Sequence, residues 1–290
     1  MENKKIQELL RRAEQGDDDA FIQLNDFYFD SDETKQFDGE AKRCFLRATE
    51  NGNTHAPYML AKLYIRRNGT GEEKAQCPAL FRRSIEAGHT FVWNYLGYCY
   101  ENGIGTDEDA EAAIGCYLKA ADGGSVPALA YAAYLYFFKL KAPEKGIELY
   151  KKAAAAGYSP AAYTLGVLYE EADEIPHDAE KSIYWYRRAG ALADENTDWE
   201  IANIYAKGKI VERNMVKAAQ YYEHGSEYGD DDCTTALALC LLHGDGVEKD
   251  EARAVRLLEK AAANGNENAQ EELLALRAGK DGQKIQKGEK

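Results

Sequence analysis

The chain has 290 residues, with 36 Lys and Arg against 50 Asp and Glu, and the resulting formal net charge of −14 would repel the phosphates of nucleic acid and the headgroups of anionic lipid. Hydrophobic residues make up 45% of the sequence, which excludes a disordered chain. Neither the first residues nor the interior holds the apolar run that a signal peptide or a membrane span requires, so we expect a folded, soluble, cytoplasmic protein that binds no nucleic acid and no membrane.

The predicted elements recur along the chain every 36 residues, with one interval of 33. Each interval ends in a small residue, which we call the junction residue: Gly16, Gly52, Gly88, Gly124, Gly157, Ala193, Gly229 and Gly265. Residues 1–16 are predicted to form a capping helix, and residues 17–265 seven repeats. A second capping helix is expected over residues 266–277, followed by a disordered basic tail over residues 278–290.

Each repeat is predicted to be a pair of antiparallel helices. The ninth residue after a junction is small, and the twelfth is large: Tyr28, Tyr64, Tyr100, Tyr136, Tyr169, Tyr205 and Leu241. A second helix carries a large residue seven positions before the next junction: Phe45, Phe81, Tyr117, Tyr150, Tyr186, Tyr222 and Leu258. Small residues let paired helices approach closely while the rings fill the space between repeats. The pattern predicts an all-α fold, a right-handed superhelical α/α solenoid of about seven 36-residue helix-turn-helix repeats with half-repeat caps.

Two of the repeats contain a two-glycine loop followed by an aspartate. Gly103, Gly105 and Asp109 carry it in LGYCYENGIGTDEDAEAAIGCYLKAADGG, and Gly244, Gly246 and Asp250 carry it in LALCLLHGDGVEKDEARAVRLLEKAAANG. With these features the chain resembles the Sel1-like repeat family, relatives of the tetratricopeptide repeat, over about residues 17–276. The resemblance implies an adaptor scaffold that holds partner proteins on its concave surface.

A secreted branch of that family joins neighbouring repeats through paired cysteines and is linked to penicillin-binding and β-lactamase-like activity. Other residues stand at those cysteine positions in this chain, which weakens the transfer of that activity. A hydrolase of the β-lactamase or peptidoglycan type is therefore the weakest of the functions that the resemblance implies.

Residues that could carry chemistry do not gather in the sequence. The six cysteines form no CxxC pair and are predicted to be free thiols: Cys44, Cys77, Cys99, Cys116, Cys233 and Cys240. The five histidines lie in different repeats, outside any catalytic or metal-binding motif: His55, His89, His177, His224 and His243. We therefore predict a non-enzymatic protein that uses neither a cofactor nor a metal.

Aromatic residues dominate the face that is predicted to bind a partner. By analogy with tetratricopeptide hairpins, positions three, six, ten and thirteen after each junction should line the concave surface. In the middle repeats these positions supply Phe91, Tyr98, Tyr134, Phe137, Tyr163 and Trp199, and towards the start Phe29, Tyr58 and Ile65. Such rings offer a large contact area for a protein or peptide partner. The alternative is that most tyrosines pack between repeats.

Acidic residues concentrate in three windows, residues 30–40, 101–111 and 170–180, which are predicted to be loops between paired helices. The simplest interpretation is a solvated ridge. The alternative is electrostatic capture of a basic partner, which would make the protein an inhibitor or an immunity protein that neutralises a basic effector. The sequence indicates no particular oligomeric state.

Overall fold

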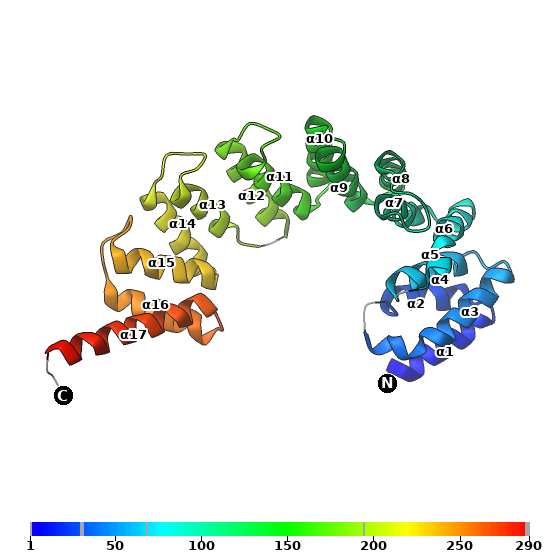
Figure 1. Ribbon diagram of the computed structural model, residues 1–290, viewed down its shortest axis with the longest axis horizontal. Helices are drawn as coiled ribbons and strands as arrows, with labels where there is room; N and C mark the ends of the chain where they lie inside the picture. The colour runs from blue at the N-terminus through cyan, green and yellow to red at the C-terminus, as the bar shows by residue number, and fades with distance from the viewer. Residues whose placement is uncertain (1, 30–31, 68, 194, 288–290) are drawn as a thin grey trace. The chain divides into compact units, whose positions relative to one another are not determined.

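The computed structural model describes residues 2–29, 32–67, 69–193 and 195–287, which form helices joined by loops and contain no strand (Figure 1). This confirms the predicted all-α fold class. The chain divides into two compact units, residues 1–153 and residues 154–290. Among the described residues, no helix is both long enough and apolar enough to cross a bilayer.

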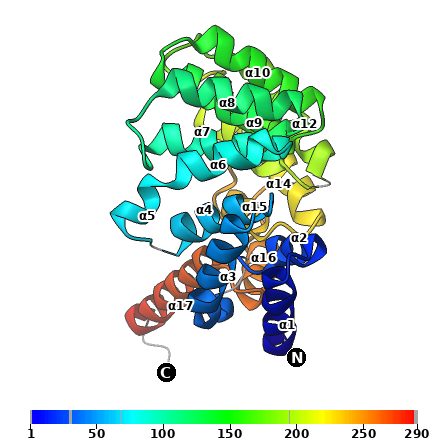
Figure 2. The same cartoon turned by 90° about the vertical axis from the view of Figure 1, so that its right-hand side faces the viewer.

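The first unit consists of short helices that succeed one another along the chain. They are α1 (Glu2–Glu14), α2 (Asp18–Phe27), the 3₁₀ helix η1 (Asp32–Phe37), α3 (Asp38–Glu50), α4 (Ala56–Arg66), α5 (Gly71–Ala75), α6 (Cys77–Glu86), the 3₁₀ turn η2 (Thr90–Val92), α7 (Trp93–Asn102), α8 (Ala110–Asp122), α9 (Val126–Tyr134), the π-helical segment η3 (Leu135–Lys139) and α10 (Pro143–Ala155). The short α5 stands at the edge of this unit (Figure 2). The boundary between the units falls near the end of α10.

The second unit continues the alternation of first and second helices. They are α11 (Ser159–Glu171), α12 (Ala179–Ala193), α13 (Asp198–Lys207), α14 (Met215–Glu227), α15 (Asp231–His243), α16 (Glu251–Ala263) and α17 (Glu267–Lys287). Within this unit α11 packs on α12, α13 on α14 and α15 on α16, and α17 packs on α16.

The last helix is longer than predicted. We expected it to end at residue 277, whereas α17 continues to Lys287, into the segment for which the sequence predicted a disordered tail. No proline interrupts this segment, and its lysine and glutamine residues favour a helix, whereas Gly279 and Gly282 and the lack of an apolar period do not. Residues 288–290 of that predicted tail lie outside the described residues.

The core runs between the paired helices, where small residues face large rings. In α7 the Cβ of any residue larger than glycine at position 97 would stand 2.8 Å from Cε1 of Tyr117 on α8. In α11 the same holds at Gly166, where a Cβ would stand 2.7 Å from Cδ1 of Tyr186 on α12. These pairs bury the tyrosine rings and explain the alternation of small and large residues in the sequence.

The first helix covers the beginning of the core. Ile6, Leu9, Leu10 and Ala13 of α1 are all buried, and α1 packs against both α2 and α3. A helix with one apolar face at the end of a repeat array supplies the neighbour that the first hairpin otherwise lacks.

Candidate functional site

The six predicted partner-binding side chains fall into two sets, one in each unit. Phe91, Tyr98, Tyr134 and Phe137 belong to the first unit, and Tyr163 and Trp199 belong to the second. Phe91, Tyr98, Tyr134 and Tyr163 are exposed, with between 41% and 44% of their surface accessible, and Trp199 is half-buried.

Phe137 does not lie on the surface, and the prediction for this residue was wrong. Its side chain is completely buried and packs over Gly146 of α10, where a Cβ would stand 2.8 Å from that of Phe137. The thirteenth position after a junction faces the second helix of its own hairpin, as Glu101 and Glu170 also show by accepting hydrogen bonds from that helix.

The π-helical turn changes which ring is exposed after Tyr134. Leu140 donates its backbone N–H to the carbonyl of Leu135 five residues earlier, at 2.9 Å, so the turn contains one residue more than an α-helical turn. Phe138 is thereby exposed, with its ring centroid 5.0 Å from that of Tyr134. The sequence gives no simple signal of this turn beyond the shortened interval of the repeat.

A groove of about 790 Å³ lies in the first unit on the face that carries Phe91 and Tyr98. We call it the tyrosine groove. Side chains from α4, η2, α7 and α9 line it, most prominently Lys62, Arg66, Phe91, Tyr95, Tyr98 and Tyr131. Tyr95 and Tyr131, which the sequence analysis did not select, belong to this face, and Tyr131 is 48% exposed. Tyr134 is not among its lining residues.

Two basic side chains, Lys62 and Arg66, line one side of the tyrosine groove. Lys62 is nearly buried, and its Nζ donates to Oδ1 of Asn25 at 2.9 Å and stands 4.4 Å above the ring of Phe29. Arg66, one turn later on α4, donates from Nη1 to the carbonyl of Phe29 at 3.5 Å. These contacts hold both basic side chains in place, one turn apart on α4.

Glu101 supplies the negative charge of the tyrosine groove. Its Oε2 accepts a hydrogen bond from Oη of Tyr117 at 2.5 Å. Burial and this carboxylate both raise the pKa of Tyr117 above its ordinary range, so the phenol remains protonated. The carboxylate and the cations therefore lie on the same groove, which can accept a partner segment that carries both charges.

The second unit has a smaller hollow, of about 220 Å³, beside Trp199. Its lining includes Trp199 of α13, Asp232, Thr235 and Leu239 of α15, and Glu272 of α17. Tyr163 lies elsewhere in this unit, where its Oη donates to Oε1 of Glu200 at 3.1 Å. Burial, followed by the charge of Glu200, raises the pKa of Tyr163 to about 12.

The three acidic windows are only partly exposed loops. Residues 32–37 form η1, Asp109 caps α8 by accepting from the N–H of Ala112, and Asp178 accepts from the N–H of Lys181 at the start of α12. Glu170 is buried, with Oε2 accepting from Oη of Tyr186 at 3.0 Å. Asp107 and Glu108 are exposed and remain available to a charged partner.

Two histidines that are distant in the sequence lie together. The ring centroids of His55 and His89 are 4.3 Å apart, Nδ1 of His55 is 3.4 Å from Oδ1 of Asp18, and Nε2 of His89 is 3.2 Å from Oγ1 of Thr54. Burial and the neighbouring His55 lower the pKa of His89, and Asp18 acts in the opposite direction. Among the described residues, no group of three or more His, Cys, Asp or Glu side chains is arranged to hold a metal ion.

All six cysteines are buried and free. Burial raises the pKa of Cys99 to about 12 and that of Cys77 to about 11, so these sulfurs remain thiols at neutral pH. Their surroundings suit small hydrophobic side chains rather than nucleophiles.

A family model of the Sel1 repeat matches residues 94–125, 126–158, 159–194, 199–227 and 232–266, which together make up more than half of the chain. The chain belongs to the Sel1 repeat family. The two-glycine loops that indicated this resemblance lie in the first and the last matched segments. Five segments match rather than seven, and the count of seven repeats stays a prediction.

Solved structures of Sel1 repeat proteins resemble the chain. A protective antigen of uropathogenic Escherichia coli with an SLR fold is 26% identical, with a TM-score of 0.54, and the match covers 92% of this chain and 58% of the antigen, so the chain spans little more than half of that relative. A Sel1 repeat protein from Oxalobacter formigenes is 26% identical, with a TM-score of 0.48, covering 75% of this chain and 86% of the relative. Cysteine-rich protein B of Helicobacter pylori is 28% identical, with a TM-score of 0.35, covering 46% of this chain and 96% of the relative.

No curated protein matches the chain. Sel1 repeat proteins generally act as scaffolds for protein–protein interactions and are typically not enzymes.

Proposed function

We propose that this protein is a non-enzymatic scaffold that binds a peptide segment of a partner protein in the tyrosine groove of its first unit. The observation that carries the proposal is the groove of about 790 Å³, in which exposed rings of Phe91, Tyr98 and Tyr131 stand on separate short elements of one unit. Aromatic rings held on rigid helices give a partner a large contact area at a small cost in side-chain entropy.

The chemistry of the groove favours a peptide over a small molecule. Its rings are spread over η2, α7 and α9 and are flanked by Lys62 and Arg66 on one element and Glu101 on another. An extended segment with apolar side chains and charges of both signs would match these groups along its length. A compact ligand would meet only part of them.

The test is partner capture by paired variants. The double substitution Tyr98→Ala and Tyr131→Ala removes two rings of the groove, and we expect it to abolish capture of a partner from the native host, identified by mass spectrometry. The control is Tyr184→Ala with Tyr228→Ala, which removes two exposed tyrosines of the second unit. Equal capture by both double variants, at unchanged helicity in circular dichroism, would show that another surface binds.

The exposed acidic residues favour a second candidate, an inhibitor or immunity protein that neutralises a basic effector. Asp107 and Glu108 are exposed on the loop between α7 and α8, in a chain whose net charge is −14. Association through such charges slows steeply as salt is raised. A partner whose association rate is insensitive to salt, and to Asp107→Asn with Glu108→Gln, rules out this candidate.

We also propose that the protein works in a reducing, cytoplasmic compartment, because its six cysteines are separate, buried thiols. When the host cells are lysed directly into denaturant that contains a thiol-labelling reagent, we expect all six cysteines to be modified. Fewer than six modified cysteines would indicate disulfides and an oxidising compartment.

A further inference from the structure

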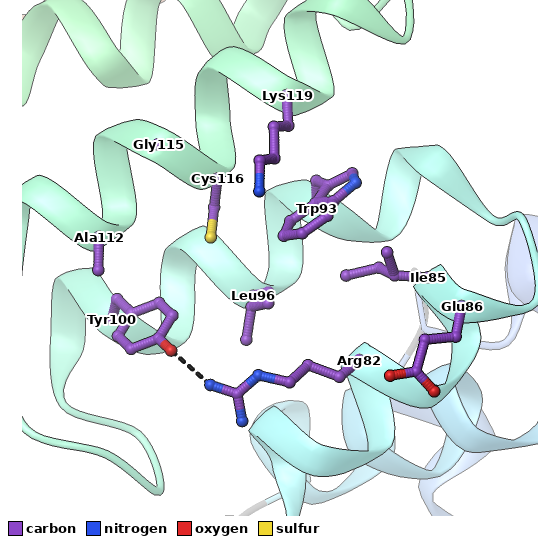
Figure 3. A pocket seen from close by; sticks show the side chains of 10 residues that line it. All are labelled: Arg82, Ile85, Glu86, Trp93, Leu96, Tyr100, Ala112, Gly115, Cys116 and Lys119. Carbon is purple, nitrogen blue, oxygen red and sulfur yellow. Dashed lines mark hydrogen bonds between the residues drawn. The ribbon is translucent and has the colours of Figure 1, made fainter.

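A hollow of about 520 Å³ is lined by side chains of α6, α7 and α8 (Figure 3). It lies on a different face of α7 from the tyrosine groove. We call it the α6–α8 groove. Trp93, Leu96 and Tyr100 of α7 line it, whereas Tyr95 and Tyr98 of the same helix line the tyrosine groove. The two grooves can therefore be occupied independently within one unit.

The repeat that contains this groove lacks a lysine that the next three repeats have. Twelve residues before their junctions these repeats carry Lys145, Lys181 and Lys217, whose ammonium groups stand 5.3, 5.3 and 4.8 Å from the ring centres of Tyr136, Tyr169 and Tyr205. In the repeat of the α6–α8 groove the equivalent residue is Ala112, and the equivalent tyrosine is Tyr100. No lysine of α8 therefore stands over the ring of Tyr100, and the guanidinium of Arg82 from α6 lies there instead, 6.0 Å from the ring centre.

A missing ring enlarges the same space. In the second unit Tyr221 of α14 stacks on Tyr205, with ring centroids 5.9 Å apart, and its Oη accepts from Nη2 of Arg187 at 2.6 Å. The residue equivalent to Tyr221 in α8 is Cys116, and the equivalent of Arg187 is Arg82, which donates instead to Oη of Tyr100 at 2.5 Å. The α6–α8 groove thus occupies the place that a tyrosine ring fills in the other unit.

The groove is open from the solvent side as well. A Cβ built on Gly115 of α8 meets nothing within 4 Å, so the helix presents bare backbone to the hollow at this point. Glycine in the interior of a helix lowers its stability relative to alanine. Here it leaves room beside Ala112 and Cys116.

Two basic side chains and one carboxylate line this apolar space. The ammonium group of Lys119 stands 4.3 Å above the ring of Trp93, and the guanidinium of Arg82 enters from the opposite side, while Glu86 lies at the edge (Figure 3). A hollow that carries two cations and one carboxylate, in a chain with a net charge of −14, is a local exception to the charge of the protein. Such a site attracts an anionic group.

We propose that the α6–α8 groove is a second docking site, which takes a partner segment with an aromatic side chain between acidic residues. The ring occupies the space that corresponds to Tyr221 of the second unit, against Tyr100 and Trp93. The acidic residues pair with Arg82 and Lys119. This site does not depend on the tyrosine groove.

The test uses a synthetic dodecapeptide with the sequence Glu-Glu-Phe-Glu in a Gly/Ser background, added to the full-length protein labelled with ¹⁵N. The chain has three tryptophans, so the indole N–H signals report on separate places, and Trp93→Phe assigns the one in the groove. We expect the peptide to shift the Trp93 signal alone, in a saturable manner. A peptide with Gln for Glu, or with Ser for Phe, should bind at least ten-fold more weakly.

Filling the groove provides the decisive variant. Gly115→Phe projects a ring into open space and should weaken peptide binding at least ten-fold, while helicity is retained. Gln220→Phe is the control, because Gln220 is exposed and holds the same register position in the second unit. The proposal is overturned if the Trp93 signal does not move at millimolar peptide, if the Gln peptide binds equally well, or if Gly115→Phe binds like the control. None of these results depends on Tyr98 or Tyr131.

Discussion

Two glycines on neighbouring helices, Gly97 of α7 and Gly115 of α8, have opposite surroundings. A Cβ at position 97 would stand 2.8 Å from the ring of Tyr117, whereas a Cβ at position 115 meets open space. Gly97→Ala gains about 1 kcal/mol in helix propensity but loses roughly 1–3 kcal/mol through overpacking, so we expect net destabilisation. Gly115→Ala should stabilise by about 0.5–1 kcal/mol.

Urea unfolding of both variants measures the two changes in the free energy of unfolding, which should have opposite signs. The two positions lie in the same unit and on helices that pack together, so differences in the denatured chain largely cancel. If Gly97→Ala is as stable as the wild-type protein, the close approach of Tyr117 to α7 is not required by the fold.

Glu170 of α11 is a buried carboxylate. Its Oε2 accepts a hydrogen bond from Oη of Tyr186 at 3.0 Å, and Tyr186→Phe leaves the buried carboxylate without that bond. We expect a loss of about 1.5–3 kcal/mol in the free energy of unfolding. Combining Tyr186→Phe with Glu170→Leu should recover most of the loss, because both polar partners are then replaced. An equal loss in the single and double variants would contradict this explanation.

The rows of tyrosines in the sequence predicted the packing of the core but not its hydrogen bonds. The rings seven residues before a junction, such as those of Tyr117 and Tyr186, are buried as expected, because the helical period alone places them in the core. Their acceptors, Glu101 and Glu170, fall inside windows that composition assigned to acidic loops. A local charge count cannot distinguish a carboxylate that caps a helix or bonds a phenol from one that faces water.

At the scale of elements, the two-glycine loop ties one repeat to the preceding one. In the loop before α16, Gly244 and Gly246 both have positive φ, 77° and 74°. A Cβ on Gly246 would stand 2.1 Å from the backbone oxygen of Met215 at the start of α14, whereas one on Gly244 has no neighbour closer than 3.7 Å. The second glycine therefore permits contact between repeats.

Alanine substitutions separate the requirement for a positive φ from the requirement for space beside the backbone of Met215. Gly244→Ala should cost roughly 1–2 kcal/mol, the strain of a left-handed residue with a side chain. Gly246→Ala should cost clearly more, because the same strain is joined by a clash with backbone that cannot move aside. Thermal and urea unfolding would give the order, and equal costs would mean that only the backbone angle matters.

The π-helical turn η3 marks the limit of prediction by register. Counting from the junction placed Phe137 on the binding face, but the position faces the second helix and the extra residue of the turn exposes Phe138 instead. The groove residues Tyr95 and Tyr131 were missed for a related reason, since a one-dimensional register does not show which faces of three successive first helices meet. Phe91 and Tyr98, which were selected by analogy with tetratricopeptide hairpins, are both exposed, Phe91 in η2 and Tyr98 in α7.

The contact between His55 and His89 joins α4 to η2 and should make stability depend on pH. Burial and the charge of a protonated His55 lower the pKa of His89 in the folded protein, against the opposing effect of Asp18. The unfolded chain therefore takes up the proton more readily, and stability falls as pH drops through the ordinary histidine pKa near 6.5, levelling off below the folded value. His89→Gln should reduce this slope between about pH 7.5 and pH 5.

Unfolding free energies at several pH values test this prediction by difference. The carboxylates titrate in both proteins and cancel in the comparison, so the change in slope belongs to the histidine pair. A slope that is the same with and without His89 would show that His89 has the same proton affinity in the folded and unfolded chains.

At the scale of the whole molecule, a chain of repeats should distribute its stability locally. Within each unit the helices contact mainly elements that are close in sequence, and the contacts divide the chain into two units. In such arrays a destabilised repeat opens without unfolding distant ones, because stability is a sum of repeat and nearest-neighbour terms. The 36-residue repeat thus predicts how stability is distributed along the chain as well as the architecture.

Leu258 of α16 and Leu60 of α4 provide a matched pair for the last prediction. Both side chains are buried, one in each unit, and truncation to alanine should cost about 2–5 kcal/mol at either position. Leu258→Ala should accelerate amide hydrogen exchange in α15, α16 and α17 and leave the exchange rates of α3 and α4 unchanged. Leu60→Ala should have the reverse effect. If each substitution instead accelerates every helix by the same factor, the chain unfolds as a single cooperative body, and a partner bound at either groove of the first unit would then stabilise the second unit equally.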